Sequence, residues 1–293
     1  MSGTGSPERS SRGVDDESRP EDLYGMQDRV VVVSGGTQGL GEEVARLAVS
    51  RGAAGVALLG RDVHRGEALA GRLGGDTDVR FFAVELGIAD ECRRVMAEVA
   101  EAYGRIDGLV NAAATTARGS VWDTSPELWD QMMAVNARAP FLLLQAAALL
   151  MRERGRGGSI VNIGSVAAHG GQEFLTPYAS SKGALSVLTR NAAYQLMRHR
   201  IRVNQVNPGW METRGEDLIQ RRYHGASDGW AERAGAAMPF GRLLQPLEVA
   251  RAVLFLLSDE SGMMTGSIVD FDQSVQGAGD VARPPTGPLW GET

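Results

Sequence analysis

Short strand-like runs and longer helical stretches alternate along the chain from residue 30 to residue 271. The strand-like runs, rich in aliphatic and β-branched residues, are 30–34, 56–59, 79–84, 108–111, 159–163, 202–206 and 268–271. The helical stretches are 42–51, an Arg-, Glu-, Ala- and Leu-rich segment after the second strand, 91–103, 126–154, 177–200 and 246–258. Such alternation is typical of parallel strands joined by crossover helices. We therefore predict an α/β fold with a single doubly wound domain, in which a parallel seven-stranded sheet carries helices on both faces.

The two ends of the chain lie outside this alternation. Residues 1–25 contain six acidic and three basic residues and almost no apolar ones, so they cannot offset the entropy of ordering. We expect 1–25 to be a disordered N-terminal tail and 26–280 to be the folded domain. Residues 281–293 carry three prolines and are expected to form a C-terminal tail.

The overall composition excludes several classes of protein. A net charge of −6 argues against a nucleic-acid partner bound through a broad basic surface. The longest apolar run, 139–151, is interrupted by Gln145 and is too short to span a bilayer, and residues 1–25 hold no signal-like stretch. The single cysteine, Cys92, rules out an intramolecular disulfide and a multi-thiolate metal site. We therefore expect a cytoplasmic protein that binds no nucleic acid, no membrane and no metal.

A glycine-rich turn follows the first predicted strand and opens the first helix. Residues 34–41 have the glycine spacing G-x-x-x-G-x-G. Glycines at such a turn let the backbone approach a pyrophosphate, which the N-terminus of the following helix attracts. Because the chain has 38 glycines, a turn without a ligand is the alternative. The position after the first strand of a βα series favours a dinucleotide site in a Rossmann-like domain.

The end of the second strand bears on which dinucleotide is bound. Gly60 is followed by Arg61, whose charge can hold the 2′-phosphate of NADP, whereas an acidic residue there would favour NAD. Asp62 fits the N-cap position of the next helix, and a solvated loop arginine is the alternative for Arg61. We expect NADP, with NAD as the second candidate.

Tyr178 and Lys182 carry the strongest chemical signal. They are four residues apart at the start of a helical stretch, so their side chains share one face. A free tyrosine has a pKa of about 10, and a neighbouring ammonium lowers that pKa so that the phenol can work as a general acid or base. Lys182 is the only lysine, and the other 29 basic residues are arginines, whose planar guanidinium is a different shape.

These motifs together resemble those of the short-chain dehydrogenase/reductase family over about residues 26–275. The matching features are the turn 34–41, Asn111, Asn136 within Val135-Asn136-Ala137, Ser165, the Tyr178/Lys182 pair, Asn207-Pro208-Gly209 and Thr213. The resemblance implies that Tyr178 exchanges the proton of the substrate oxygen and that Ser165 hydrogen-bonds this oxygen. It also implies that Lys182 holds the nicotinamide ribose and that Asn136 fixes a water linking Lys182 to solvent.

The same resemblance implies a cofactor site along the ends of the strands. Its residues are Ser34, Gly35, Thr37, Gln38, Gly39, Leu40, Gly41, Arg61, Glu85, Leu86, Asn111, Ala112, Ala113, Tyr178, Lys182, Pro208, Gly209 and Thr213. Two segments depart from the family pattern: Ala114 stands where the family has glycine, and Gln273-Ser274 stands where it has Gly-Gly. The first change adds a methyl group near the nicotinamide, and the second reshapes a subunit contact or the pocket edge.

Substrate residues are expected after Ser165, at the start of the Tyr178 helix and in the segment 210–238. The candidates are Ser165, His169, Gln172, Tyr178 and Trp210. The segment 210–238 is long enough for a lid and rich in charges, although a solvated amphipathic helix is the plainer interpretation. Its polar content favours a polyhydroxylated or anionic substrate over a steroid.

We therefore predict an NAD(P)-dependent oxidoreductase that transfers a hydride between the nicotinamide and a secondary alcohol or ketone, with a sugar or polyol as candidate small-molecule substrate. A second hypothesis is a 3-oxoacyl thioester reductase, which predicts an arginine patch at the active-site mouth for an acidic carrier protein. A third is a non-catalytic NADP-binding sensor or scaffold. The resemblance also implies a homotetramer or homodimer built on the helices around 126–154 and 177–200.

Overall fold

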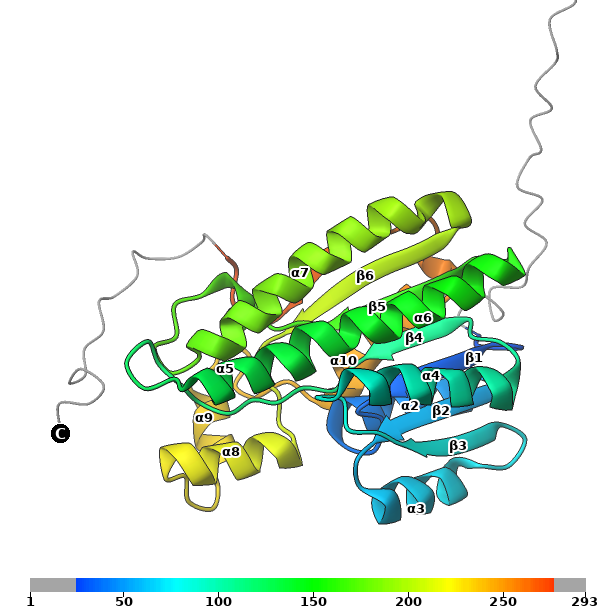
Figure 1. The fold of residues 1–293 in the computed structure, drawn as a ribbon. Coiled ribbons are helices and arrows are strands. Elements are labelled where there is room, and N and C mark those ends of the chain that lie inside the picture. Colours follow the sequence, from blue (N-terminus) through cyan, green and yellow to red (C-terminus); the bar gives the residue numbers. More distant parts are fainter. Residues whose placement is uncertain (1–24, 277–293) are drawn as a thin grey trace, which may run out of the picture.

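Seven parallel strands form one sheet in the order β3-β2-β1-β4-β5-β6-β7 (Figure 1). The computed structural model describes residues 25–276, so both predicted tails lie outside it apart from Gly25. The strands are β1 (Val30–Ser34), β2 (Gly55–Gly60), β3 (Asp78–Ala83), β4 (Gly108–Asn111), β5 (Gly158–Ile163), β6 (Ile201–Pro208) and β7 (Ile268–Phe271). The predicted seven-stranded parallel sheet is confirmed, with strand ends that differ from the predicted ones by no more than a few residues.

Helices cover both faces of the sheet, as predicted (Figure 1). They are α2 (Gly39–Ser50), α3 (Val63–Leu73), α4 (Ala89–Tyr103), α5 (Pro126–Met133), α6 (Ala139–Arg154), α7 (Thr176–Leu196), α8 (Arg214–His224), α9 (Trp230–Ala236) and α10 (Pro246–Leu257). α2, α3 and α10 pack on one face, and α4, α6 and α7 pack on the other. The layers therefore follow the doubly wound pattern.

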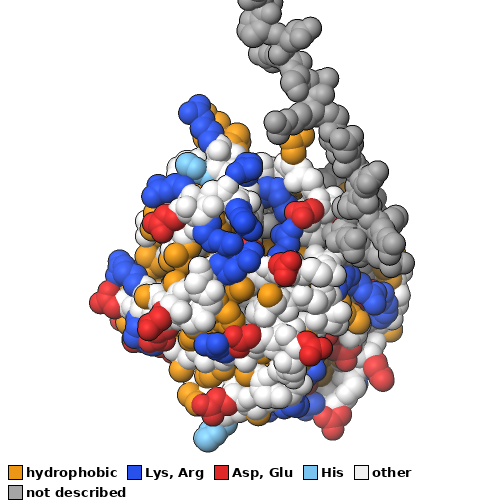
Figure 2. All heavy atoms as spheres, turned by 90° about the vertical axis from the view of Figure 1, so that its right-hand side faces the viewer, with side chains coloured by type: hydrophobic (Ala, Val, Ile, Leu, Met, Phe, Trp, Pro, Cys, Tyr) orange, Lys and Arg blue, Asp and Glu red, His pale blue; other side chains and the backbone are white. Residues whose placement is uncertain are grey.

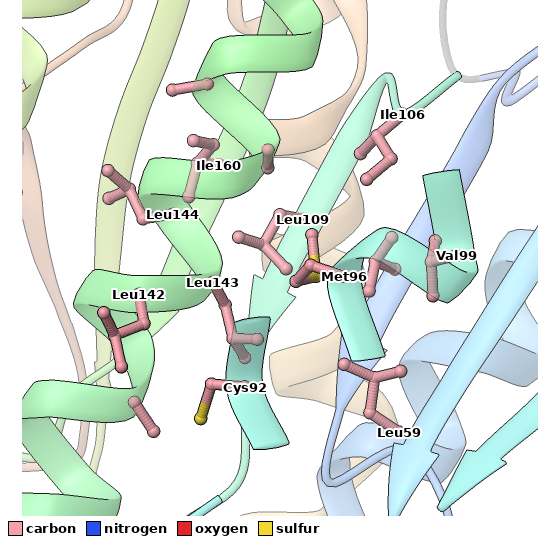
Figure 3. Close-up of a cluster of buried hydrophobic side chains, with 14 of the residues drawn as sticks. Leu59, Cys92, Met96, Val99, Ile106, Leu109, Leu142, Leu143, Leu144 and Ile160 are labelled. Carbon is pink, nitrogen blue, oxygen red and sulfur yellow. The ribbon is translucent and has the colours of Figure 1, made fainter. Parts of the chain in front are cut away.

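The core has two halves because successive side chains of a strand point to opposite faces of the sheet. Val31 and Val33 are buried on the face covered by α2 and α10, whereas Val32 is buried on the face of α4 and α6. Figure 3 shows the second half, where Cys92 of α4 lies near Leu143 of α6. Burial of Cys92 raises the pKa of its thiol, so this cysteine serves as a packing residue.

The predicted helix 126–154 is continuous, but it is not a uniform α-helix. A π-helical turn, Ala134–Arg138, joins α5 to α6 and carries the fully buried Asn136. Pro140, in the first turn of α6, has no N–H to donate in the regular α-helical pattern. The spacing of apolar residues continues through the turn, which is why the sequence indicated a single regular helix.

This stretch is also strongly apolar. Among the described helices, Pro126–Arg154 is the one that is long and apolar enough to span a membrane by length and composition, with a mean hydropathy of 1.4 over 18 residues. Leu143, Ala147 and Met151 are fully buried with the side chains of α4 and the central strands. This buried part, 39% of the apolar window, packs in the core, where each buried leucine contributes about 1.5–3 kcal/mol.

The amino ends of the strands form a surface with both signs of charge. Figure 2 shows this end of the molecule, where basic and acidic side chains lie among each other. Asp107, directly before β4, makes ion pairs with Arg105 at 2.7 Å and Arg154 at 3.1 Å, and Arg29, directly before β1, pairs with Asp259 at 2.6 Å. These paired charges lie opposite the carboxyl ends of the strands, where the polar residues of the candidate site gather.

Candidate active site

The strand order reverses between β1 and β4, and ligands of open α/β sheets bind at such a switch point. Ser34, the last residue of β1, lies beside Asn111, the last residue of β4. The Ser34 hydroxyl accepts a hydrogen bond from the backbone N–H of Ala113 at 3.4 Å. The predicted glycine-rich turn and the Asn111–Ala113 segment therefore meet at the carboxyl end of the sheet.

The glycine-rich turn has no room for side chains at two positions. Gly35 has a φ of +69°, and a Cβ there would lie 2.8 Å from the backbone of Ala113. A Cβ at Gly41 would lie 2.2 Å from the carbonyl oxygen of Gly35. The Gln38 side chain does not cap α2, so the N–H groups of the first turn are open to an anion. This cradle fits the pyrophosphate of a dinucleotide.

The other predicted residues of the turn have definite positions. Thr37 and Leu40 are buried, and the Gln38 amide oxygen accepts a hydrogen bond from Arg65. A Cβ at Gly39 would lie 3.7 Å from the methyl group of Thr213, so the segment after β6 lies against the turn. Residues that the sequence separates by more than 170 positions thus line one cradle.

The end of β2 presents one exposed cation. The Arg61 side chain is 75% exposed, and its nearest carboxylate is Glu85 at 3.6 Å. Asp62 caps α3 by accepting from the N–H of Arg65 at 3.0 Å, as predicted, and it also pairs with the Arg65 guanidinium at 3.0 Å. Asp62 is therefore occupied, while Arg61 lies at the position where an adenosine ribose is expected.

Lys182 lies beneath Tyr178 on α7. Its side chain is almost completely buried, its ammonium lies 5.7 Å from the centre of the Tyr178 ring, and it donates to the main-chain oxygen of Ile163 at 2.7 Å. Burial lowers the pKa of Lys182 to about 8. The ammonium still predominates at neutral pH, so a buried positive charge adjoins the phenol.

The pKa of Tyr178 moves in the opposite direction from the predicted one. Burial raises it, a hydrogen bond with Ser165 and the charge of Arg118 lower it, and the carboxylate of Glu216 raises it further. Sequence reasoning weighed only the neighbouring ammonium, whereas the loss of hydration around the hydroxyl dominates in the fold. Tyr178 therefore stands as a neutral phenol at neutral pH.

Ser165 lies two residues after the end of β5 and caps a short 3-10 helix, Val166–His169. Its hydroxyl oxygen accepts from the backbone N–H of Ala167 at 3.1 Å. This bond fixes the side chain and leaves the hydroxyl hydrogen available as a donor toward Tyr178 or a ligand. Ser165, Tyr178 and Lys182 are thus brought together as the sequence predicts.

Asn136 fastens three segments together. Its amide oxygen accepts from the N–H of Thr115, and its amide nitrogen donates to the Thr115 carbonyl, both at 2.9 Å. The nitrogen also donates to the Ser181 hydroxyl at 3.1 Å. Asn136 therefore positions the loop after β4 against α7, one residue before Lys182, and its role in a water relay stays a prediction.

The predicted cofactor residues at and after the ends of β3, β4 and β6 lie at the carboxyl end of the sheet. Leu86 and Asn111 are buried, and Ala112 and Ala113 are partly buried. A Cβ at Gly209 would lie 1.7 Å from a carboxylate oxygen of Asp272, so a larger residue after Pro208 would displace the Asp272 side chain. Thr213 caps α8 by accepting from the N–H of Glu216 at 3.0 Å.

The substituted residue Gln273 holds the edge of the site. Its amide oxygen accepts from the N–H of Phe240 at 2.8 Å, and its amide nitrogen donates to the Arg242 carbonyl at 2.6 Å. Glycine could make neither bond. In this chain the departure from the family pattern therefore fastens the connection between α9 and α10 to the end of β7.

The predicted substrate residues other than Ser165 and Tyr178 have partners of their own or are exposed. His169 pairs with Asp270 of β7 at 2.9 Å, and Gln172 is exposed. The Trp210 indole donates to Glu216 at 3.0 Å and stacks on Trp230 at 5.8 Å between ring centres. Trp210 thus packs on α8 and α9, which lie beyond the carboxyl ends of the strands (Figure 1).

Sequence reasoning missed Arg118. It lies in the loop between β4 and α5, its side chain is only 9% exposed, and its charge acts on Tyr178. The only signal in the sequence was an arginine seven residues after Asn111, in a chain with 29 arginines. Its contacts come from Phe174 and from α8, far away along the chain.

Comparisons with known proteins agree with this geometry. A family model described as Enoyl-(Acyl carrier protein) reductase matches residues 35–275. The NADP-dependent (R)-specific alcohol dehydrogenase of Lentilactobacillus kefiri is 32% identical, over 86% of this chain and 98% of its own. The 3-oxoacyl-acyl-carrier-protein reductase of Thermotoga maritima is also 32% identical, over 84% and 97%.

A solved structure titled short chain dehydrogenase/reductase family protein matches with a TM-score of 0.73 and 35% identity, over 85% of this chain and 97% of that one. The relatives are oxidoreductases, and the cradle, the buried lysine and the Ser165–Tyr178 contact all lie within the matched region. The chain therefore belongs to the short-chain dehydrogenase/reductase family of NAD(P)-dependent oxidoreductases acting on CH–OH groups.

Proposed function

We propose that Tyr178 is the general acid and base of an enzyme that interconverts a secondary alcohol and a ketone. The observation that carries this proposal is the placement of one phenol against both the Ser165 hydroxyl and the buried Lys182 ammonium. When bound, the nicotinamide supplies or accepts the hydride. The protein's own residues move the proton and stabilise the reacting oxygen.

In the reducing direction Tyr178 begins as a neutral phenol and gives its proton to the carbonyl oxygen. Ser165 donates a hydrogen bond to the same oxygen, because its own oxygen is already held by Ala167, and this bond stabilises the developing negative charge. Lys182 favours the phenolate that Tyr178 becomes. One ammonium hydrogen is directed to Ile163, and in this proposal the other two donate to ribose hydroxyls.

NADP is the proposed cofactor. Arg61 is exposed at the end of β2, and the one acidic residue beside it in sequence, Asp62, is occupied by Arg65. The Glu85 carboxylate, 3.6 Å from Arg61, opposes an added phosphate, so the preference is expected to be moderate. The NADP dependence of the Lentilactobacillus kefiri relative supports the same choice.

We also propose a homodimer or homotetramer built on α6 and α7. These helices expose Phe141, Leu149, Val187 and Tyr194, apolar side chains that a partner subunit would cover. Sedimentation at micromolar concentration tests the assembly, and a stable monomer would contradict it.

The single buried cysteine is compatible with a cytoplasmic location.

A 3-oxoacyl thioester is the second candidate substrate, on the strength of the Thermotoga maritima relative. The test is a panel of ketones, sugars, alcohols and acetoacetyl thioesters, assayed with both cofactors by the absorbance of the reduced nicotinamide. The proposal expects turnover of at least one carbonyl or alcohol. No turnover across the panel by protein that binds NADPH would contradict it and favour a cofactor-binding sensor.

A further inference from the structure

Arg118 is a nearly buried cation beside the proposed catalytic tyrosine. Its side chain is 9% exposed, and its charge lowers the pKa of Tyr178. A guanidinium with so little contact with water is costly unless an opposite charge or strong acceptors surround it. The question is therefore what compensates this charge.

The contacts within the described chain compensate it only in part. The Arg118 Nε donates to His224 at 3.2 Å, Nη1 donates to the Thr116 carbonyl at 2.9 Å, and the guanidinium lies 5.4 Å from the centre of the Phe174 ring. These hydrogen bonds, the ones found among residues 25–276, use two of the five N–H groups of an arginine. Three donors remain for a ligand.

Glu216 is the nearest carboxylate, but it is not a full partner. Its oxygen lies 3.7 Å from Arg118 Nη2, beyond hydrogen-bond distance. The same oxygen already accepts from the Trp210 indole at 3.0 Å and from the Gln220 amide at 2.7 Å. Glu216 is thus held by α8 and Trp210, and it lies near the Arg118 guanidinium without accepting a hydrogen bond from it.

The loop of Arg118 is fixed before any ligand arrives. Gly119 and Leu175 form a parallel bridge, in which the N–H of Gly119 donates to the Phe174 carbonyl and the N–H of Thr176 donates to the Gly119 carbonyl, both at 3.0 Å. This bridge couples Arg118 to the segment that leads directly into Tyr178. A preorganised donor set binds an anion with less entropic cost than a mobile side chain.

We infer that Arg118 binds a carboxylate of the substrate, so that the substrate is a short oxo acid or the corresponding hydroxy acid. The inference rests on the proposed function, because it places the reacting carbonyl of the substrate at Tyr178. The carboxylate of the same substrate then lies at the neighbouring guanidinium of Arg118. The planar fork of a guanidinium suits a planar carboxylate. A singly charged group is favoured because Glu216 is nearby, and a neutral polyol would leave the cation uncompensated.

The test compares acetoacetate, 2-oxobutanoate and 4-oxopentanoate with their methyl esters, which are similar in shape but uncharged. For the wild type, at least one acid is expected to exceed its ester in kcat/KM about tenfold or more. Arg118→Met is expected to raise the KM for that acid roughly 10- to 100-fold and to bring the acid-to-ester ratio of kcat/KM toward one, because a change in the pKa of Tyr178 affects acid and ester alike. Arg118→Lys keeps the charge and is expected to restore part of the preference.

Two further variants separate ligand binding from a structural role. Glu216→Gln removes the competing carboxylate but leaves Arg118, so the KM for the acid is expected to fall. Arg222→Met removes an exposed arginine of α8, the helix that carries Glu216, and is expected to leave the KM values for acid and ester unchanged. A loss in Glu216→Gln as large as that in Arg118→Met would overturn the inference and make the pair a support for α8.

The outcomes also separate this inference from the proposed function. If the wild type reduces esters and neutral ketones as well as the acids, the enzyme stands and the carboxylate site is wrong. If it turns over no carbonyl compound and no alcohol while it binds NADPH, both are wrong. Should Arg118→Met fail to fold, the test rests on the ratio of kcat/KM for acid to kcat/KM for ester, measured in the wild type and in Arg118→Lys. If this ratio is close to one in both proteins, the inference is overturned.

Discussion

The ammonium of Lys182 lies 5.7 Å from the centre of the Tyr178 ring and is anchored on the main-chain oxygen of Ile163 at 2.7 Å. The only lysine of the chain is therefore held between the end of β5 and the proposed acid–base residue. Its side chain is 2% exposed, so the space is shaped for a compact cation. The 29 arginines elsewhere indicate that a guanidinium does not serve at this position.

Lys182→Arg tests this relationship. The charge remains, but the planar guanidinium cannot donate to Ile163 and to ribose hydroxyls in the geometry of an ammonium. We expect kcat to fall about 10²-fold or more, within the range of lost acid–base catalysis. Circular dichroism monitors the fold, and Arg190→Lys on α7 is the matched control. Wild-type turnover in Lys182→Arg would contradict the role given to the ammonium.

The buried lysine also predicts how stability depends on pH. Its pKa is about 8 in the folded protein and near 10.5 when unfolded, so between these values the unfolded chain binds more protons. The free energy of unfolding then rises with pH in this window, relative to a variant without the group. Urea unfolding of the wild type and of Lys182→Met from pH 7.5 to pH 10 measures the difference. A gap that stays constant with pH would show that the folded pKa is not lowered.

Arg61 and Glu85 predict cofactor preference in opposite directions. Arg61→Ala removes the cation proposed to hold the 2′-phosphate, and we expect the ratio of kcat/KM for NADP to that for NAD to fall about tenfold. Glu85→Gln removes the opposing carboxylate, and the ratio is expected to rise. Steady-state kinetics with both cofactors measures the ratios. An unchanged ratio in Arg61→Ala would remove the basis for proposing NADP.

Two glycines with different surroundings test the cradle. A Cβ at Gly41 would lie 2.2 Å from the Gly35 carbonyl oxygen, so Gly41→Ala is expected to destabilise the protein by about 1–3 kcal/mol and to weaken NADPH binding. Gly71 lies within α3 with nothing within 4 Å of its Cβ position. Gly71→Ala is expected to stabilise by about 0.5–1 kcal/mol and to leave NADPH binding unchanged. Equal effects of the two changes would contradict a tightly packed turn.

The sequence was most informative where a local pattern determines structure. The alternation of strand-like and helical segments predicted the parallel sheet, and the glycine spacing predicted the turn before α2. Asp62 was predicted to cap the next helix, and it caps α3. The π-helical turn around Asn136 was missed, because apolar spacing does not distinguish it from an α-helical turn.

Features that depend on distant segments were beyond reach. Arg118 is positioned by its hydrogen bond with His224, 106 residues later, and by the bridge between Gly119 and Leu175. The direction of the Tyr178 pKa depends on how much water the fold removes from the hydroxyl, which no spacing between two residues reveals. Local chemistry was therefore predictable, and its tuning by tertiary packing was not.

Tyr178→Phe tests whether the Tyr178 hydroxyl transfers the proton. The variant loses one hydroxyl and keeps the ring above Lys182, so NADPH affinity measured by fluorescence is expected to stay near that of the wild type. Turnover of the best substrate in the panel is expected to fall about 10²- to 10⁴-fold. Wild-type turnover by Tyr178→Phe would show that another group moves the proton.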